Sequence, residues 1–331
     1  MEPITKPLYN HYGGIIARAS PKRYRIARVY MVGATAKGAG APHPLTLVPV
    51  EMKMSAQKRL LFAFGHPDDE ANLAGSTIAK YSAEGAAVLV VIATRGEEGE
   101  IVPGSHATAE TLGVVREAEL RASIAVLRAS LALFDYRDSG MPGTPTTAGP
   151  RAFVQAPEDE VVGKLTTLMR LHKPQVVVTF DENGGYGHPD HITISKTTTR
   201  AFHASGNTHY VDPEALPAWT PSKLYYMGIP REHLRQWLEA YTRRKPDNAY
   251  RHLDIDTMYM PKDAFTTCLD VRAYIDMRRQ AIAQHKSEVN LFEMFPASMH
   301  EEIFGHDYFV LVHPRRSDIA GRSESDLFEG L

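Results

Sequence analysis

From residue 58 onward, short apolar runs alternate with amphipathic stretches of helical spacing. The apolar runs are continuous, as in strands buried on both faces, and they predict strands at 59–65, 86–94, 131–136 and 176–180. The amphipathic stretches predict helices over 70–84, 109–129 and 158–172, and a further helix that starts just after 188–191. Weaker patterns predict a strand at 223–229, a helix at 270–286 and a late strand at 308–313.

The order of these elements predicts the fold class. Buried strands joined by helical crossovers form parallel sheets with helices on both faces. We therefore expect an α/β fold with a Rossmann-like, doubly wound, mostly parallel sheet. Because the pattern weakens after about residue 205, we expect the remainder to be a C-terminal α/β elaboration of the same domain.

The first fifty residues differ in character from the rest of the chain. They contain seven Lys/Arg and one acidic residue, Glu2, and are rich in Gly and Pro without a sustained period. Three interpretations are open: an organelle transit segment, a flexible extension, or translated sequence upstream of a start at Met52 or Met54. Because serine is scarce there, we favour the last two, and we predict that 1–55 lies outside the folded domain.

Composition excludes several classes of protein. The 331 residues carry a formal charge of -2, which argues against nucleic acid as a partner. No run approaches the roughly 18 apolar residues of a membrane-spanning helix. The single cysteine, Cys268, allows neither an internal disulfide nor a multi-thiolate zinc site. We expect a cytoplasmic protein, and the sequence leaves open whether it forms a homo-oligomer.

Each of the four strongest strands is followed by an unusually polar segment. These segments are HPDDE at 66–70, TRGEEG at 94–99, RDSG at 137–140 and DENGGYGHPDH at 181–191. Ligands of open parallel sheets bind beyond the carboxyl ends of the strands. We therefore expect the four segments to meet at one rim of the sheet.

Two of these segments suggest a metal site. Two histidines and one carboxylate are a common catalytic ligand set, and His66, Asp69 and His191 can supply it. Asp68 would then be free to act as general base on a water molecule. Helix capping by the aspartates is the alternative for either segment alone. Two such segments after the first and fourth strands, which neighbour each other at the switch point, favour the metal site.

The segments HPDDE, TRGEEG, RDSGM and GYGHPDH together resemble the LmbE/PIG-L family of zinc-dependent N-acetylglucosamine deacetylases. The resemblance covers roughly residues 58–313 and is strongest up to about 200, with the mycothiol-pathway deacetylase and conjugate amidase as the most similar branch. It implies a deacetylase domain over 56–331 that holds one divalent ion, with zinc expected and Fe(II) as the alternative. Its ligands fall on His66, Asp69 and His191 and its base on Asp68, as the residues alone suggest.

The resemblance also implies roles for residues around the metal. It places on His188 the histidine that polarises the amide oxygen, with Asp190 positioned to tune it. It implies that Arg116 and Asp138 contact substrate hydroxyls, whereas a surface salt bridge and a turn cap are their structural alternatives. Tyr186 lies in a Gly-rich loop, where it either stabilises the oxyanion or packs over the site.

These inferences predict a metal-dependent hydrolase that removes an N-acyl group, with acetyl expected, from a glucosamine-type glycoconjugate. The alternative is an amidase that cleaves the glucosamine–cysteine amide of a mycothiol-type S-conjugate, because the same machinery cuts either bond. From a different class, a non-hydrolytic sugar- or nucleotide-binding module is disfavoured because GxGxxG is missing after the first strand. The expected partner is a small N-acylated amino sugar. We assign no role to Glu97, Glu98 or His285.

Overall fold

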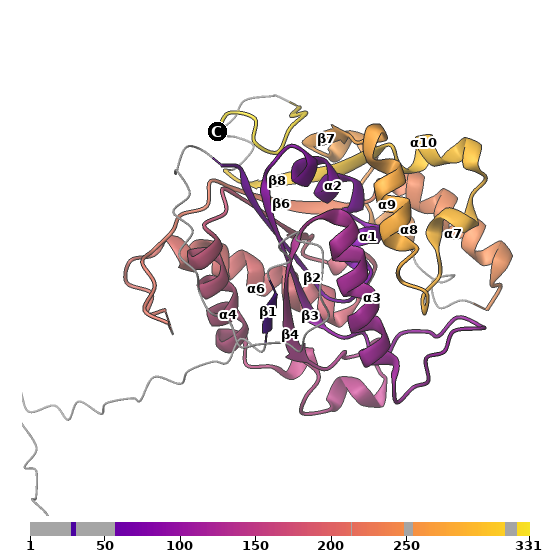
Figure 1. The fold of residues 1–331 in the computed structure, drawn as a ribbon, viewed down its shortest axis with the longest axis horizontal. Helices are drawn as coiled ribbons and strands as arrows, with labels where there is room; N and C mark the ends of the chain where they lie inside the picture. Colours follow the sequence, from indigo (N-terminus) through magenta and orange to yellow (C-terminus); the bar gives the residue numbers. More distant parts are fainter. Residues whose placement is uncertain (1–27, 31–56, 213, 248–253, 315–322) are drawn as a thin grey trace, which may run out of the picture.

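The computed structural model describes residues 28–30, 57–212, 214–247, 254–314 and 323–331. The strands form one eight-stranded sheet in the order β1-β4-β3-β2-β5-β6-β8-β7 (Figure 1). The five strands from β4 to β6 in this order are parallel, and the three outer strands pair antiparallel. The strands are Arg28–Tyr30 (β1), Arg59–Phe64 (β2), Ala87–Thr94 (β3), Ser130–Tyr136 (β4), Val176–Phe180 (β5), Lys223–Gly228 (β6), Thr267–Asp270 (β7) and His306–His313 (β8).

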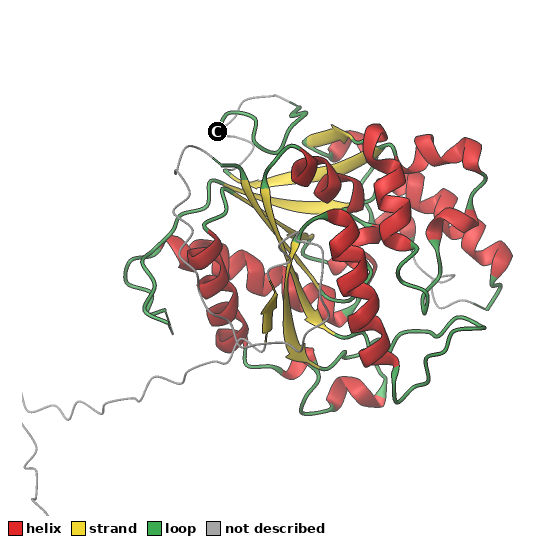
Figure 2. Cartoon of the chain, in the orientation of Figure 1, coloured by secondary structure: helices red, strands yellow, loops and turns green. Residues whose placement is uncertain are grey.

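Helices cover both faces of this sheet (Figure 2). On one face α4 and α6 pack against each other over β2, and on the other α2, α3 and α9 contact one another. This arrangement confirms the doubly wound α/β fold. The helices are Asp69–Asn72 (α1), Gly75–Ala83 (α2), Leu112–Leu127 (α3), Glu158–His172 (α4), Gly184–Gly187 (α5), Pro189–Gly206 (α6), Arg231–Arg244 (α7), Ile255–Met258 (α8), Ile275–Ile282 (α9) and His300–Phe304 (α10).

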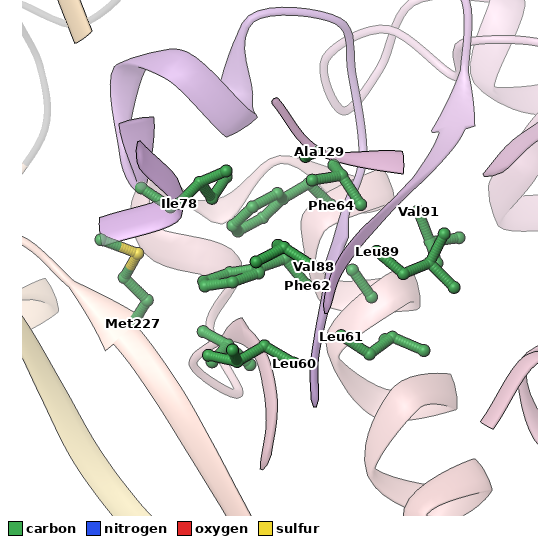
Figure 3. Close-up of a cluster of buried hydrophobic side chains, with 14 of the residues drawn as sticks. Leu60, Leu61, Phe62, Phe64, Ile78, Val88, Leu89, Val91, Ala129 and Met227 are labelled. Atoms are coloured by element: carbon green, nitrogen blue, oxygen red, sulfur yellow. The ribbon is translucent and has the colours of Figure 1, made fainter. Parts of the chain in front are cut away.

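The core explains why the central strands are continuous apolar runs. Successive side chains of a strand point to opposite faces, and helices cover both. Figure 3 shows Phe62 and Phe64 of β2 on the side of Ile78 of α2, while Leu61 and Val91 point to the opposite side. All these side chains are fully buried. Burying each contributes roughly 1.5–3 kcal/mol, so both faces of the sheet stabilise the fold.

The parallel pairing of β2 with β5 places the two histidine-bearing loops side by side. Leu60 to Phe62 lie opposite Val176 to Val178, so the strands end at the same edge of the sheet. The chain builds outward from β2 to β3 and β4 in one direction, and to β5 and β6 in the other. The predicted switch point between the first and fourth strong strands is therefore confirmed. Beyond β6, the antiparallel strands β8 and β7 form the predicted C-terminal elaboration.

One predicted helix is wrong as a continuous element. The segment predicted at 70–84 is two helices, α1 and α2, which are separated after Asn72. Arg278 of α9 donates to the backbone carbonyls of Ala71 and Asn72. A continuous helix would need these carbonyls for its own hydrogen bonds, so a residue two hundred positions away interrupts it. The predicted helix at 270–286 is likewise shorter, because its regular α-helical part is α9.

Of residues 1–55, the structure describes only β1, which pairs antiparallel with Leu131 to Leu133 of β4. The predicted extension otherwise lies outside the described residues and stays a prediction. None of the helices in the described ranges has the combined length and apolarity that a membrane span requires.

Candidate metal centre and active site

A pocket of about 410 Å³ opens at the carboxyl ends of the parallel strands. All of the sequence-predicted site residues line it except Asp190, which is fully buried. The predicted convergence of the four polar segments on one rim is therefore confirmed. The lining residues from the prediction are His66, Asp68, Asp69, Arg116, Asp138, Tyr186, His188 and His191.

The loop after β2 is shaped by Asp69. Its Oδ2 accepts the backbone N–H groups of Gly65, at 3.1 Å, and His66, at 2.8 Å. A side chain at Gly65 would place its Cβ 2.9 Å from Cδ2 of His191, so glycine allows the two loops to approach closely. The same oxygen of Asp69 also faces the histidines, whereas Asp68, the N-cap residue of α1, makes no side-chain capping hydrogen bond.

His66, His191 and Asp69 form a buried cluster of ligand atoms. His66 Nδ1 lies 3.0 Å from His191 Nε2. Asp69 Oδ2 lies 3.7 Å from His66 Nδ1 and 3.4 Å from His191 Nε2. The His191 ring stacks on Phe180, with ring centroids 3.9 Å apart, so its direction is fixed by the last residue of β5.

The outer nitrogens of both imidazoles face acceptors. His191 Nδ1 lies 3.2 Å from the carbonyl oxygen of Gly184, and His66 Nε2 lies 3.1 Å from Asp190 Oδ2. A carbonyl or carboxylate oxygen only accepts, so each outer nitrogen carries a proton. The two inner nitrogens and Asp69 Oδ2 face one another, and they can share a divalent ion in place of a proton. This donor set fits a divalent metal ion.

The charges around His66 also favour a cation. Burial lowers the pKa of His66, but Asp138, Asp190 and Asp69 together raise it well above its usual value. The cluster therefore attracts positive charge, which a proton supplies in the absence of a metal. The same two histidines and His188 have ring nitrogens within 4.8 Å of one another, so His188 is a further residue at ligand distance.

The structure corrects the expected partner of Asp190. Its carboxylate contacts His66 and accepts the backbone N–H of Ser139, at 3.0 Å, rather than contacting His188. The backbone N–H of Asp190 donates to Nδ1 of His188 at 3.2 Å, so the His188 side chain caps the N-terminus of α6. Asp190 therefore orients a metal-facing histidine. The sequence pattern missed this because HPDH places Asp190 beside both histidines.

His188 is held as a neutral donor. Since Nδ1 accepts from the Asp190 backbone, the ring proton resides on Nε2. Burial, followed by the nearby imidazoles of His66 and His191, lowers the pKa of His188 to about 2. This finding opposes the expectation of a protonated His188 and leaves it an N–H donor that points into the site.

Asp68 opens to the pocket beside the cluster. Its Oδ2 accepts from Asn72 Nδ2 at 3.0 Å, and its Oδ1 lies 3.5 Å from Arg116 Nη2. Burial is the main cause that raises the pKa of Asp68 to about 8, against the lowering effect of Arg116. The residue has φ of 109°, a left-handed conformation that costs a non-glycine residue on the order of 1–3 kcal/mol.

Arg116 is surrounded by protein acceptors. Its Nη1 and Nη2 donate to the carbonyls of Gly96 and Pro67, each at 2.8 Å, and Nη2 lies 2.9 Å from Glu288. A Cβ at Gly96 would lie 2.1 Å from Nη1, so the glycine of the second polar segment makes room for the guanidinium. Two guanidinium donors of Arg116 are therefore taken by loop carbonyls, while its Nε is buried with no hydrogen-bond partner among the described residues.

Asp138 and Tyr186 take up the remaining positions. Asp138 accepts the N–H groups of Gly140, at 2.8 Å, and Glu98, at 3.2 Å, and lies 3.9 Å from His188 Nε2. It is a turn cap, as one alternative held, that also borders the pocket. The Tyr186 ring meets His191 edge-on, with centroids 5.1 Å apart. Tyr186 therefore packs over the site while it lines the pocket.

Sequence reasoning missed Glu70 and assigned no role to His285. Glu70 is fully buried next to the metal-facing loop, and its Oε1 lies 2.8 Å from His285 Nε2. Burial lowers the pKa of His285, but Glu70 raises it above its usual value. The pair joins residues 215 positions apart, and a lone histidine near the end of a helix carries no local signal for such a partner.

The opposite wall of the pocket comes from the C-terminal elaboration. It is largely apolar and aromatic, and the sequence pattern did not mark it as part of a site. Its residues include Tyr226, Met227, Ile229, Leu234, Trp237, Tyr241, Tyr259, Phe265, Leu291, Phe304, Tyr308 and Val310.

Comparisons with known proteins agree with this geometry. Residues 61–202 match the family model described as "PIG-L: GlcNAc-PI de-N-acetylase". Curated proteins of Geodermatophilus obscurus and Rhodococcus erythropolis, both named 1D-myo-inositol 2-acetamido-2-deoxy-alpha-D-glucopyranoside deacetylase, are each 38% identical to this chain. Their alignments extend over 296 and 295 residues, and each covers 84% of this chain and 99% of the relative.

Solved structures share the fold at lower identity. The 4-carboxy-2-hydroxymuconate hydratase GalB of Pseudomonas putida is 19% identical, with a TM-score of 0.56 over 78% of this chain and 98% of that one. The N,N'-diacetylchitobiose deacetylase of Pyrococcus horikoshii is 20% identical, with a TM-score of 0.52 over 77% and 84%. A hydratase and a deacetylase share this fold, so the fold alone does not set the activity. On its near full-length relatives and its four motifs, the chain belongs to the PIG-L/LmbE family.

Proposed function

We propose that this protein is a metal-dependent N-deacetylase of a glucosamine glycoconjugate, with 1D-myo-inositol 2-acetamido-2-deoxy-alpha-D-glucopyranoside as substrate. The observation that carries the proposal is the convergence of the inner nitrogens of His66 and His191 with Asp69 Oδ2. Asp68 borders this cluster from the open side of the pocket. The names of the relatives, which match over nearly their whole length, supply the substrate.

His66, Asp69 and His191 would hold the ion, for which we propose zinc. A bound divalent ion would polarise the acyl carbonyl and lower the pKa of a neighbouring water molecule. Asp190 and Gly184 fix the ring protons of the two histidines on the outer nitrogens. The buried position of these groups excludes bulk water from the ligand atoms.

Asp68 is the proposed general base. It accepts a proton from the attacking water and passes it to the amine nitrogen as the C–N bond breaks. Burial raises its pKa, which makes the carboxylate a stronger base than a solvent-exposed aspartate. Asn72 and Arg116 hold the carboxylate toward the pocket during these steps.

His188 and Tyr186 border the place where the acyl oxygen would develop negative charge. His188 carries its proton on Nε2, so it can donate a hydrogen bond to that oxygen without being charged. The backbone N–H of Asp190 fixes the ring by donating to Nδ1, and Asp138 lies 3.9 Å from Nε2. We propose this oxyanion role for His188 and assign Tyr186 to the same wall of the pocket.

A second candidate is the amidase that cleaves a glucosamine–cysteine amide in a thiol conjugate. The apolar wall favours it, because Trp237, Leu234 and Phe304 offer an apolar surface to a bulky conjugate next to the catalytic groups. The catalytic residues would be the same, so the two activities differ only in what the wall accommodates.

Amine release by the zinc-loaded protein separates these functions. We expect release from the acetylated glucosaminyl inositol, with a lower kcat/KM for free N-acetylglucosamine and for thiol conjugates that carry an aryl group. A higher kcat/KM for the aryl conjugate would instead identify the amidase. Binding of sugar and zinc without amine release from any of these compounds would contradict both and support a binding module.

A further inference from the structure

The strained backbone of Asp68 is held by a neighbouring side chain. The Asp68 N–H donates to Glu70 Oε2 at 3.0 Å, and the residue adopts φ of 109°. A left-handed non-glycine residue persists only when its surroundings hold it there. Glu70 therefore sets the direction in which the Asp68 side chain leaves the loop.

Glu70 is in turn held from two other elements. Its Oε1 accepts from Ser123 of α3 at 2.6 Å and lies 2.8 Å from His285 Nε2, just after α9. Glu70 is fully buried, and His285 is 3% exposed. A buried carboxylate stays in one place only when its oxygens are paired, so these donors fix the position of Glu70.

The segment 278–288 contacts residues 66–72, here called the base loop because they contain Asp68, at two further points. Arg278 donates to the carbonyl of Ala71 at 3.2 Å. Glu288 pairs with Arg116, whose Nη2 donates to the Pro67 carbonyl and lies 3.5 Å from Asp68. Three side chains of one C-terminal segment thus contact the base loop directly or through one intermediate residue.

We propose that His285 is a positioning residue for Asp68, acting through Glu70, and that segment 278–288 holds the general base in its working orientation. The inference rests on the proposed role of Asp68. It assigns a catalytic consequence to a segment that lies outside the matched family region, 61–202.

The geometry separates this role from support of the metal. Asp69 is held by the N–H groups of Gly65 and His66, which follow directly from β2. In the described part of the chain, the His285 side chain hydrogen-bonds to Glu70 and not to these atoms. Loss of His285 should therefore shift the base and leave the metal ligands in place.

The test compares His285→Ala with the wild-type zinc enzyme and with His285→Gln, whose side-chain amide can still donate to Glu70. We expect kcat of His285→Ala to fall about 10²-fold, since small misplacements of catalytic groups have effects of this size. KM and bound zinc should stay within about two-fold, and His285→Gln should restore most of kcat. Unchanged kcat, or zinc lost in proportion to kcat, would overturn the proposal.

A matched control removes a buried ion pair far from the pocket. Lys223 Nζ lies 2.6 Å from Glu324, and both residues are buried. Lys223→Met should lower the melting temperature and leave kcat of the folded protein unchanged. If His285→Ala does not fold, Ser123→Ala removes the other donor to the same oxygen of Glu70, and it should lower kcat several-fold with zinc retained.

Two further measurements tie the effect to Asp68. In an Asp68→Asn background, adding His285→Ala should cause no further loss of kcat, because both changes act on one group. A further loss of kcat in the double variant would overturn the proposal that His285 acts on Asp68 through Glu70. Crystal structures of the wild type and of His285→Ala test the positioning of Asp68 without any substrate. In His285→Ala, the φ angle of Asp68 should leave the left-handed region. An unchanged loop would overturn the inference, whereas absent turnover in the wild type would overturn only the proposed function.

Discussion

The two sides of the pocket are built by different means. On the side of the parallel strands, ligand atoms are fixed by bonds to nearby backbone, as when Asp69 accepts from Gly65 and His66. On the C-terminal side, the wall consists of apolar and aromatic side chains, and the polar residues that reach the loops, Arg278 and His285, come from more than two hundred positions away. The side of the parallel strands carries the proposed catalytic groups. The C-terminal side lines the rest of the pocket and contacts the segment that carries Asp68.

A pair of buried histidines makes the same contrast at atomic scale. His66 and His285 each lie against a carboxylate, at 3.1 Å from Asp190 and 2.8 Å from Glu70. The second nitrogen of His66 faces His191 and Asp69, as a ligand would. The second nitrogen of His285 is buried and has no hydrogen-bond partner among the described residues. A buried histidine–carboxylate pair therefore lies at the proposed metal site in one case and beside the loop that carries Asp68 in the other.

Removing a ligand should have the largest effect. His191→Ala takes one of three protein ligands, so bound zinc and activity should both be lost, as they should be when a chelator strips the wild type. Metal analysis of the purified variant measures this. His188→Ala serves as the comparison and should keep its zinc; if the two variants exchange these outcomes, His188 is the ligand.

Replacing the base should separate chemistry from metal binding. Asp68→Asn keeps the shape of the side chain but cannot accept a proton, so kcat should fall by roughly 10²- to 10⁴-fold. Zinc content should match the wild type, because Asp69 and the histidines are untouched. A variant that turns over normally would exclude the base role, and one that loses zinc would make Asp68 a ligand.

His188→Ala should lower kcat by roughly 10²- to 10³-fold through loss of an oxyanion donor. Because the pKa of His188 is lowered to about 2, its imidazole is neutral throughout the assay range above about pH 4. A bound cation would lower that pKa further. The limbs of the pH–rate profile should therefore keep their positions in the variant, and a limb that disappears would show that His188 titrates during turnover.

Changes on the C-terminal wall should be smaller and selective. Trp237 stacks on Tyr241, with centroids 5.5 Å apart, and lines the pocket. Trp237→Ala should lower kcat/KM for aryl-bearing amides by about ten-fold, the scale of one lost apolar contact, and change kcat for a small N-acetyl sugar little. Equal losses on both substrates would mean that the wall supports the catalytic side rather than selecting the substrate.

Local patterns were sufficient for the elements that carry the chemistry. The strands are continuous apolar runs, the loops that follow them are polar, and parallel crossovers bring these loops to one rim. His66, Asp68, Asp69 and His191 could be chosen from the sequence because they lie in the polar segments that directly follow β2 and β5, and the family resemblance added His188. Parallel pairing of β2 with β5 then requires the two loops to meet.

Only the tertiary structure decided which side chains are partners. Asp190 contacts His66 rather than its neighbour His188, Glu70 meets His285, and Arg278 divides a helix that is continuous in the amphipathic pattern. Such contacts depend on how distant elements pack, and a buried polar group accepts whichever partner the packing brings within reach. Sequence periodicity records which face of an element is buried, but it does not record what lies against that face. For this reason the catalytic rim was predictable. The apolar wall that faces it, and the contacts of His285 and Arg278 with the segment that carries Asp68, were not.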